Sequence, residues 1–85
     1  MKRRVFELDR LVADVAQDLK KTADQKNTII SVEPSESLPV LADPYRIRQV
    51  LINLLDNAIK YGKEDGIIYI HVRREPDRFV SIQVS

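Results

Sequence analysis

The segment ADPYRIRQVLINLLDNAIKYG, residues 42–62, constrains the fold of this chain more than any other stretch. Asp43 is suited to accept hydrogen bonds from the free amides at a helix start, and Pro44 fits the first helical position, where no donor is needed. Gly62 is suited to a left-handed helix stop. The segment therefore predicts one helix over 44–61, with a start signal and a stop signal of its own.

Two asparagines, Asn53 and Asn57, lie inside this predicted helix, where each costs roughly half a kcal/mol or more relative to Ala. At about 100° per residue they share an arc of about 100° with Lys60 and Tyr61. These four residues are called the asparagine arc below. The same side of the helix also holds Arg46 and Val50, and the apolar face expected against a sheet comprises Ile47, Leu51, Ile52, Leu54, Leu55, Ala58 and Ile59. A polar arc beside a buried face is the position expected of a pocket wall.

The remainder of the chain predicts one further helix and three strands. Apolar residues at steps of three and four predict an amphipathic helix over about 6–25. The same pattern fits a coiled-coil seam, but it lasts little more than two heptads, so packing on a sheet is favoured. β-Branched and alternating segments predict a strand at 28–33 and an antiparallel hairpin with strands at 67–74 and 79–85 around a turn at Pro76–Arg78. PSESLP (34–39) is a predicted loop, and Val40–Ala42 is either a very short strand or an extended approach to the next helix.

The order helix, strand, helix, hairpin favours the α/β class, as a two-layer α/β sandwich with two helices packed on one face of a mostly antiparallel sheet. The chain has 85 residues, enough for one domain with one modest core. Ile68, Ile70 and Val72 alternate inward in the strand at 67–74. His71, the only histidine, alternates outward and is interpreted as a plain surface residue.

Composition excludes several classes of function. The chain has no cysteine, which excludes thiol catalysis, disulfides and thiolate metal sites. Its net charge of +1 provides no general attraction to nucleic acid or to an anionic membrane. Only Lys2–Arg4, interpreted as a solvated terminus, and Arg73-Arg74 favour a nucleic-acid-binding domain, and no aromatic platform accompanies them. No apolar stretch is long enough to span a membrane or to form a signal peptide. We expect neither a nucleic-acid partner nor direct membrane contact.

The asparagine arc has a chemistry of its own. A carboxamide oxygen of Asn53 or Asn57 is a ligand that Mg²⁺ accepts, and the amide NH₂ donates to phosphate oxygens. Lys60 supplies a positive charge for the same phosphates, and Tyr61 a planar face for a base or ribose. The arc is therefore suited to Mg²⁺ with a nucleoside triphosphate. The same residue types also occur on ordinary exposed helix faces, and the arc alone leaves both interpretations open.

Residues 42–62 closely resemble the asparagine box of sensor histidine kinases, whose catalytic domain belongs to an ATPase superfamily shared with DNA gyrase, a heat-shock chaperone and the MutL repair proteins. The preceding VFELDRLVADVAQDLKKTADQKNTIISVE resembles the opening helix and strand of that domain, and the predicted hairpin occupies the place of its central strands. The resemblance covers nearly the whole chain from Val5. It implies part of the ATP-binding catalytic domain of a two-component sensor histidine kinase.

The resemblance also implies roles for the arc. The residue matching Asn57 coordinates the Mg²⁺ that bridges the ATP phosphates, and the residue matching Asn53 assists at the same site. Lys60 matches a lysine that contacts phosphate, and Tyr61 an aromatic that packs beside the nucleotide. In ATP-hydrolysing relatives the position of Asn53 is a glutamate that activates water. An amide cannot take that proton, which fits phosphoryl transfer to a histidine and thence to a response-regulator aspartate.

Several parts of the family pattern have no counterpart in these 85 residues. The glycine boxes, the aspartate that binds adenine and the phosphoacceptor histidine are all missing, the last because it belongs to a helical dimerisation domain upstream. We therefore expect residues 1–85 to be a single truncated domain, the N-terminal half of the ATP-binding domain, with no catalytic residue of its own. Alone, it is expected to lack kinase activity and to bind Mg-ATP weakly or not at all. The whole protein is expected in the cytoplasm, with any membrane anchor in segments outside this chain.

A second hypothesis treats the chain as a non-catalytic half-domain that acts as an interaction or folding module. The predicted strand at 79–85 stops at Ser85 without a closing element, and an unpaired strand edge invites self-association or pairing with a complementary segment.

Overall fold

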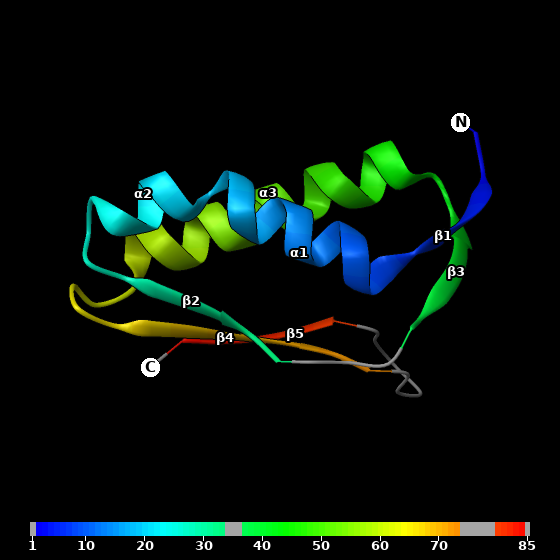
Figure 1. Cartoon of the computed structure of the whole chain (residues 1–85). Coiled ribbons are helices and arrows are strands. Elements are labelled where there is room, and N and C mark those ends of the chain that lie inside the picture. The colour runs from blue at the N-terminus through cyan, green and yellow to red at the C-terminus, as the bar shows by residue number, and fades with distance from the viewer. Residues whose placement is uncertain (1, 34–36, 74–79, 85) are drawn as a thin grey trace.

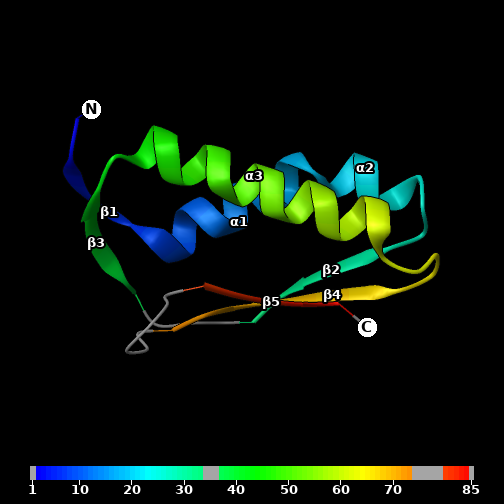
Figure 2. The same cartoon turned by 180° about the vertical axis from the view of Figure 1, so that it is seen from behind.

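The computed structural model describes residues 2–33, 37–73 and 80–84 of the chain. In chain order the elements are β1 (Arg4–Glu7), α1 (Leu8–Asp18), α2 (Lys20–Asp24), β2 (Ile29–Val32), β3 (Pro39–Ala42), α3 (Pro44–Tyr61), β4 (Ile67–Val72) and β5 (Val80–Val84). The three helices form a layer over one face of β2, β4 and β5, and β1 and β3 lie together at one end (Figures 1 and 2). The mixed α/β class predicted from the sequence is confirmed.

The strands form two small sheets. The larger has the order β2-β4-β5, and β1 pairs separately with β3. β4 and β5 are antiparallel, as the predicted hairpin requires, but β2 and β4 are parallel, with Ile29 opposite Ile67. The prediction of a mostly antiparallel sheet was therefore too simple for the larger sheet. The chain passes through α3 between β2 and β4, and such a helical crossover returns it in the same direction.

The core lies between the helix layer and the larger sheet. Alternate residues of β4 are buried, as the period-two pattern predicted. α3 contributes a stripe at every fourth position, and α1 contributes one at steps of three and four. The buried apolar residues are Leu8, Val12, Val15, Ala16, Ala23, Leu38, Leu51, Leu55, Ile59, Ile68, Ile70 and Val72.

The N-terminal segment differs most from the prediction. Residues Arg4–Glu7 form β1 instead of extending the helix, because they pair with β3. Val5 lies opposite Leu41, which is 36 residues later in the chain. The predicted helix over 6–25 is divided at Leu19, which has φ −95° and ψ 4°. Its N–H still donates to Val15 C=O at 3.1 Å, so the deviation is local. The alternative of a short strand at Val40–Ala42 is correct.

Helix α3 spans the predicted residues 44–61, but only its start is built as expected. Asp43 Oδ1 accepts a hydrogen bond from Tyr45 N–H at 3.0 Å, and Pro44 occupies the first turn. Gly62, in contrast, has φ −79° and ψ 175°, which is extended backbone. The prediction of a left-handed stop at Gly62 was wrong, because the end of the helix is stabilised by a side chain from elsewhere in the chain.

Some predictions lie outside the described residues. These are the turn at Pro76–Arg78, residues 34–36 of the loop at 34–39, and residues 74, 79 and 85 of the predicted strands.

Candidate functional site

The asparagine arc lies on the solvent side of α3. Asn53, Asn57, Lys60 and Tyr61 are all exposed, and the side chain of Tyr61 is among the most exposed of the large hydrophobic residues, at 85%. Arg46, two turns nearer the helix start, is exposed as well. The four residues predicted as a site are therefore presented together along one side of a single helix.

Apolar side chains border Asn57 on this face. Val50 and Leu54 are 53% and 51% exposed. Leu54 was predicted to face the sheet, and that prediction was wrong. The buried stripe of α3 runs through Leu51 and Leu55, and Leu54 lies about 60° outside Leu51 on the helical wheel, on the side of Asn57 and Tyr61. The exposed face of α3 is thus an apolar strip with a carboxamide in its middle.

Two neighbours on the same helix orient polar members of the arc. Gln49 Nε2 donates to Asn53 Oδ1 at 3.3 Å, across one helical turn. Lys60 Nζ lies 3.5 Å from Asp56 Oδ2, also one turn away. Both contacts follow the i, i+4 spacing and could have been anticipated from the sequence. The Asn57 carboxamide makes no side-chain hydrogen bond to any described residue, so its oxygen is open to a cation.

The C-terminal end of α3 is held by Lys26, which lies between α2 and β2. Lys26 Nζ donates to the carbonyl oxygens of Ile59, Lys60 and Gly62, at 2.9, 2.6 and 2.8 Å. Helix ends leave their last carbonyls without partners within the helix, and a cation there also interacts favourably with the helix dipole. No local pattern predicts this contact, because Lys26 is more than thirty residues from its acceptors.

The start of α3 is also linked to the first helix. Arg48 Nη2 contacts Asp18 Oδ2, which joins α3 to the end of α1. The Asp18 side chain is about half exposed, so the pair lies at the surface between the two helices.

His71 is not the plain surface residue that the sequence predicted. On the outer face of the sheet its side chain is only 22% exposed, and its Nδ1 lies 2.6 Å from Glu33 Oε2. Arg73 Nη2 lies 3.4 Å from the same oxygen. The hydrogen bond with His71, helped by the nearby charges of His71 and Arg73, outweighs desolvation and holds the pKa of Glu33 below its ordinary value. The parallel pairing of β2 with β4 creates this cluster.

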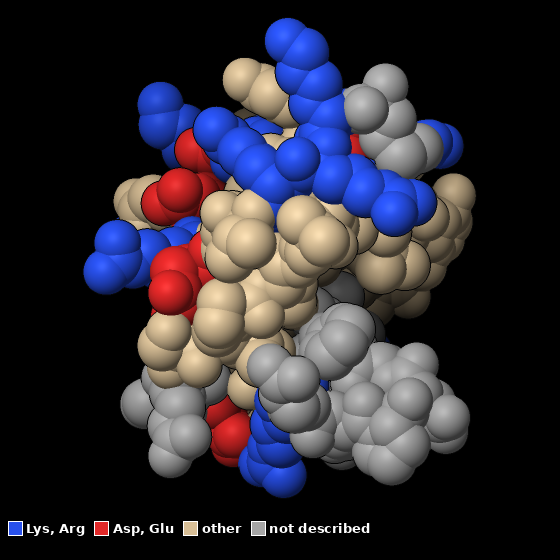
Figure 3. Space-filling model, turned by 90° about the vertical axis from the view of Figure 1, so that its right-hand side faces the viewer, with Lys and Arg blue, Asp and Glu red and all other residues tan. Residues whose placement is uncertain are grey.

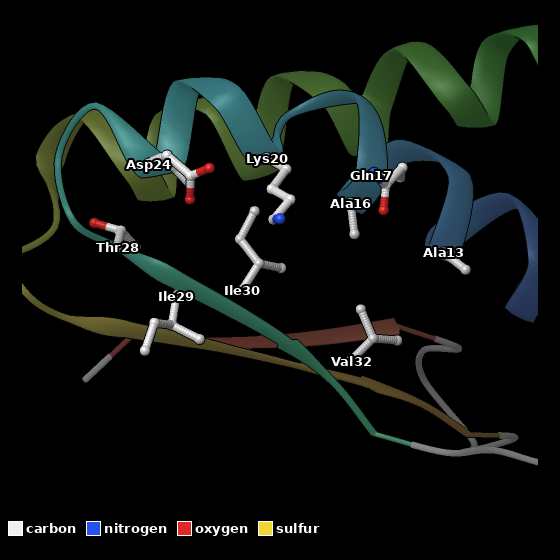
Figure 4. A pocket seen from close by; sticks show the side chains of 10 residues that line it. Ala13, Ala16, Gln17, Lys20, Asp24, Thr28, Ile29, Ile30 and Val32 are labelled. Atoms are coloured by element: carbon white, nitrogen blue, oxygen red, sulfur yellow. The ribbon is translucent and has the colours of Figure 1, made fainter.

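A cavity of about 400 Å³ lies away from the asparagine arc, between α1, α2 and β2 (Figure 4). Its lining comes mainly from small and apolar side chains, and it includes none of the four arc residues. Thr28 also lines the cavity, and its Oγ1 is buried without a hydrogen-bond partner among the described residues.

The end of the molecule that carries β1 and β3 has charged side chains on part of its surface and uncharged residues at its centre (Figure 3). Lys and Arg side chains gather in the upper part of this view, with acidic side chains beside them (Figure 3). Lys2, Arg3 and Arg4 are all exposed, as expected for a solvated terminus.

Comparison with known proteins assigns this chain to a family. Residues 42–85, which include α3 and its whole arc, match the family described as histidine kinase-, DNA gyrase B- and HSP90-like ATPase. The chain belongs to this ATPase family. The predicted membership of the ATPase superfamily is thereby confirmed.

Curated relatives within the family are sensor kinases. The chain is 36% identical over 85 residues to the circadian input-output histidine kinase CikA of Synechococcus elongatus. It is 48% identical over 65 residues to the adaptive-response sensory kinase SasA of Trichormus variabilis. The matches cover 96% and 75% of this chain but only 11% and 16% of those proteins, so the chain corresponds to a small part of each.

Solved structures of histidine kinases share the fold of this ATPase-family chain. The nucleotide-free catalytic domain of ThkA superimposes with a TM-score of 0.89 at 34% identity, covering 100% of this chain and 60% of that one. ThkA in complex with the response regulator TrrA matches with a TM-score of 0.85 at 34% identity, covering 98% of this chain and 25% of that one. In the part of the chain that the structure describes, no helix is long and apolar enough to cross a membrane.

Proposed function

We propose that this chain forms the Mg-phosphate side of the ATP site in a two-component sensor histidine kinase. In the whole protein, the γ-phosphoryl group of ATP is transferred to a histidine of the kinase's own helical domain and then to a response regulator. The chain supplies a binding wall, and the reacting histidine lies elsewhere. The exposed face of α3 carries the proposal: a carboxamide at Asn57, bordered by apolar Leu54 and Tyr61, inside the segment that matches the ATPase family.

The residues of the arc fit a magnesium nucleotide. Mg²⁺ prefers oxygen ligands and keeps several waters and phosphate oxygens, so one or two neutral amide oxygens suffice on the protein side. The Asn57 oxygen is free of described partners, whereas Asn53 is oriented by Gln49. When bound, the metal neutralises charge on the phosphates, and Lys60 adds a positive charge near them. Tyr61 and Leu54 provide surface for the less polar parts of the nucleotide.

The absence of a carboxylate at position 53 favours transfer over hydrolysis. A general base must accept a proton from the attacking water, and the amide of Asn53 cannot do so. The arc therefore binds and orients Mg-ATP, and the nucleophile comes from the phosphoacceptor histidine.

Titration of the whole protein with Mg-ATP tests this proposal. Asn57→Ala should weaken binding at least about tenfold, the equivalent of ~1.4 kcal/mol, by removing a metal ligand. Gln17→Ala, which removes an exposed carboxamide from α1, is the matched control and should leave the dissociation constant unchanged. Equal affinity of Asn57→Ala and the unaltered protein would show that the arc does not hold the metal.

The 85-residue chain alone is expected to bind Mg-ATP weakly or not at all, because one wall of a site leaves most of the nucleotide in water. Calorimetry that gave a micromolar dissociation constant for this chain would refute that expectation. The whole protein is proposed to act in the cytoplasm, where ATP and response regulators are found.

A second candidate function, self-association, is favoured by the exposed apolar side chains of α3. Val50, Leu54 and Tyr61 are each more than half exposed on one helix face, and such patches promote contact between molecules. Sedimentation equilibrium separates the two ideas. A monomer mass that is independent of concentration would exclude association, whereas a dimer lost in Leu54→Ser would support it.

A further inference from the structure

Lys26 is directed towards α3 by the turn in which it lies. Thr28 N–H donates to Ala23 C=O at 2.9 Å, and Asn27 N–H donates to Asp24 C=O at 3.0 Å. These two bonds form a Schellman motif, in which the residue after the helix end adopts a left-handed conformation. Asn27 has φ 53°, which Asn tolerates better than most residues. The motif at the C-terminal end of α2 thus fixes the backbone at position 26.

The backbone of Lys26 contacts the same region as its side chain. Its carbonyl oxygen accepts a hydrogen bond from Asp65 N–H at 3.3 Å, in the segment between α3 and β4. Asp65 also has a positive φ, 60°. The turn that follows α2 and the turn that follows α3 are therefore joined at one residue, through both its main chain and its side chain.

The ammonium group of Lys26 is fully used by this contact. An ammonium group has three donors, and the carbonyls of Ile59, Lys60 and Gly62 accept one each. Helix α3 lacks a left-handed stop at Gly62, so these carbonyls have no Schellman bonds of their own. The last turn of α3 consequently depends on a side chain that belongs to a different part of the fold.

We propose that Lys26 is a positioning residue for nucleotide binding, which it serves by holding the last turn of α3. That turn carries Lys60 and Tyr61, and the carbonyl of Lys60 is itself one of the acceptors. Asn53 and Asn57 lie further from the helix end, within its hydrogen-bonded body. The inference rests on the proposed function for its effect on nucleotide, but its structural part is independent of any ligand.

Amide hydrogen exchange on the 85-residue chain tests the structural part. In Lys26→Met, which keeps the aliphatic stem but removes the donors, the amides of residues 59–61 should exchange at least about tenfold faster, because the last turn opens locally. Amides of residues 48–55 should keep their rates. Lys21→Met removes the same charge from an exposed position on α2 and should change neither set. Unchanged exchange at 59–61, or equal acceleration along all of α3, would overturn the proposal.

Chemical rescue provides a second structural readout. The chain has no cysteine, so Lys26→Cys introduces its only thiol. Alkylation of that thiol with 2-bromoethylamine forms a carbon–sulfur bond, releases bromide and a proton, and restores an ammonium group at nearly the length of lysine. Slow exchange at residues 59–61 should return after the reaction. If the aminoethylated protein exchanged as fast as the untreated cysteine variant, the ammonium group would not be responsible.

A double-mutant cycle in the whole protein tests the effect on nucleotide. Lys26→Met should weaken Mg-ATP binding roughly tenfold, as expected when binding groups lose their position. In a background of Lys60→Ala with Tyr61→Ala, the same change should have little further effect, because the groups that it positions are gone. A full tenfold loss in that background would overturn the proposal.

The two proposals fail differently in this cycle. If Asn57→Ala and the Lys60, Tyr61 double variant leave the affinity unchanged, the proposed function is wrong, while the exchange results still decide the role of Lys26. If those variants weaken binding but Lys26→Met does not, the proposed function stands and the positioning role is refuted.

Discussion

The two ends of helix α3 are stabilised in opposite ways. At its start, Asp43 accepts a hydrogen bond from Tyr45, two residues along the chain, and Pro44 needs no partner. At its end, three carbonyls depend on Lys26, 33 to 36 residues away. A local cap forms whenever its segment becomes helical, whereas a distant cap forms only when the tertiary fold is in place. The comparison teaches that Lys60 and Tyr61 lie at the end of α3 whose cap requires the tertiary fold.

The largest expected effect comes from the core at the distal end. Ile59→Ala should lower the free energy of unfolding by about 2–5 kcal/mol, since Ile59 is buried and its truncation leaves a cavity. Urea denaturation measures the change. Val50→Ala, on the exposed face of the same helix, should stay within about 0.5 kcal/mol. Equal costs for the two variants would show that the last turn is not packed on the core.

The next effect separates the two caps. Asp43→Ala should cost about 1 kcal/mol, the usual value of a lost N-terminal cap. The helix has 18 residues and is about 27 Å long, so the losses from Asp43→Ala and Lys26→Met should add within about 0.5 kcal/mol. Denaturation of both single variants and the double variant gives the coupling. A coupling above about 1 kcal/mol would mean that the two ends do not act independently.

A smaller effect tests whether Gly62 has any special role. Its φ of −79° is open to all residues, so Gly62→Ala should be neutral or should stabilise by up to ~1 kcal/mol through the unfolded chain. Thermal unfolding provides the measurement. A loss of more than about 1 kcal/mol would instead indicate the left-handed stop that the sequence suggested.

The smallest effect concerns the cluster on the outer face of the sheet. The folded-state pKa of Glu33 is lowered from 4.5, so its contribution to stability is fully present above pH 4.5 and is lost as the pH falls through the lower folded value. At neutral pH the Glu33→Gln variant should therefore be less stable than the unaltered chain. The difference should shrink as the pH falls through the lowered pKa of Glu33. Parallel stability curves down to strongly acidic pH would contradict this assignment.

Sequence predicted the features whose causes are local. The start of α3 follows from Asp43 and Pro44, and the alternation in β4 identifies its buried face. The end of α3 lies at the predicted residue, but the left-handed conformation of Gly62 from which it was predicted is absent. The exposure of Leu54 was not predicted, because a helical wheel gives the angle of each side chain but not which neighbouring element covers it. β1 was missed because the apolar spacing of the predicted helix begins within residues 4–7. The pairing of these residues with β3 depends on a distant segment, so the local sequence does not show it.

In the candidate site, too, only features with local causes could be predicted from the sequence. The placement of the four arc residues on one side of α3 follows from their spacing, but the sequence predicted a pocket wall, whereas the structure exposes all four residues. Lys26 and the contact of His71 with Glu33 could not be predicted, because both join segments that only the fold brings together. A lysine before Asn27 and a histidine in a strand carry no local signal of their partners.

The ammonium group of Lys26 also bears on the electric field that a bound nucleotide would meet. The carbonyl end of a helix carries a partial negative charge, equivalent to about half an elementary charge, and is an unfavourable place for a triphosphate. Lys60 and Tyr61 stand at that end of α3. By placing a full positive charge on the last carbonyls, Lys26 reverses the sign of the helix terminus beside the proposed phosphate site. The hydrogen-bonded ammonium group thus makes a polyanion tolerable where the carbonyl end of the helix alone would repel it.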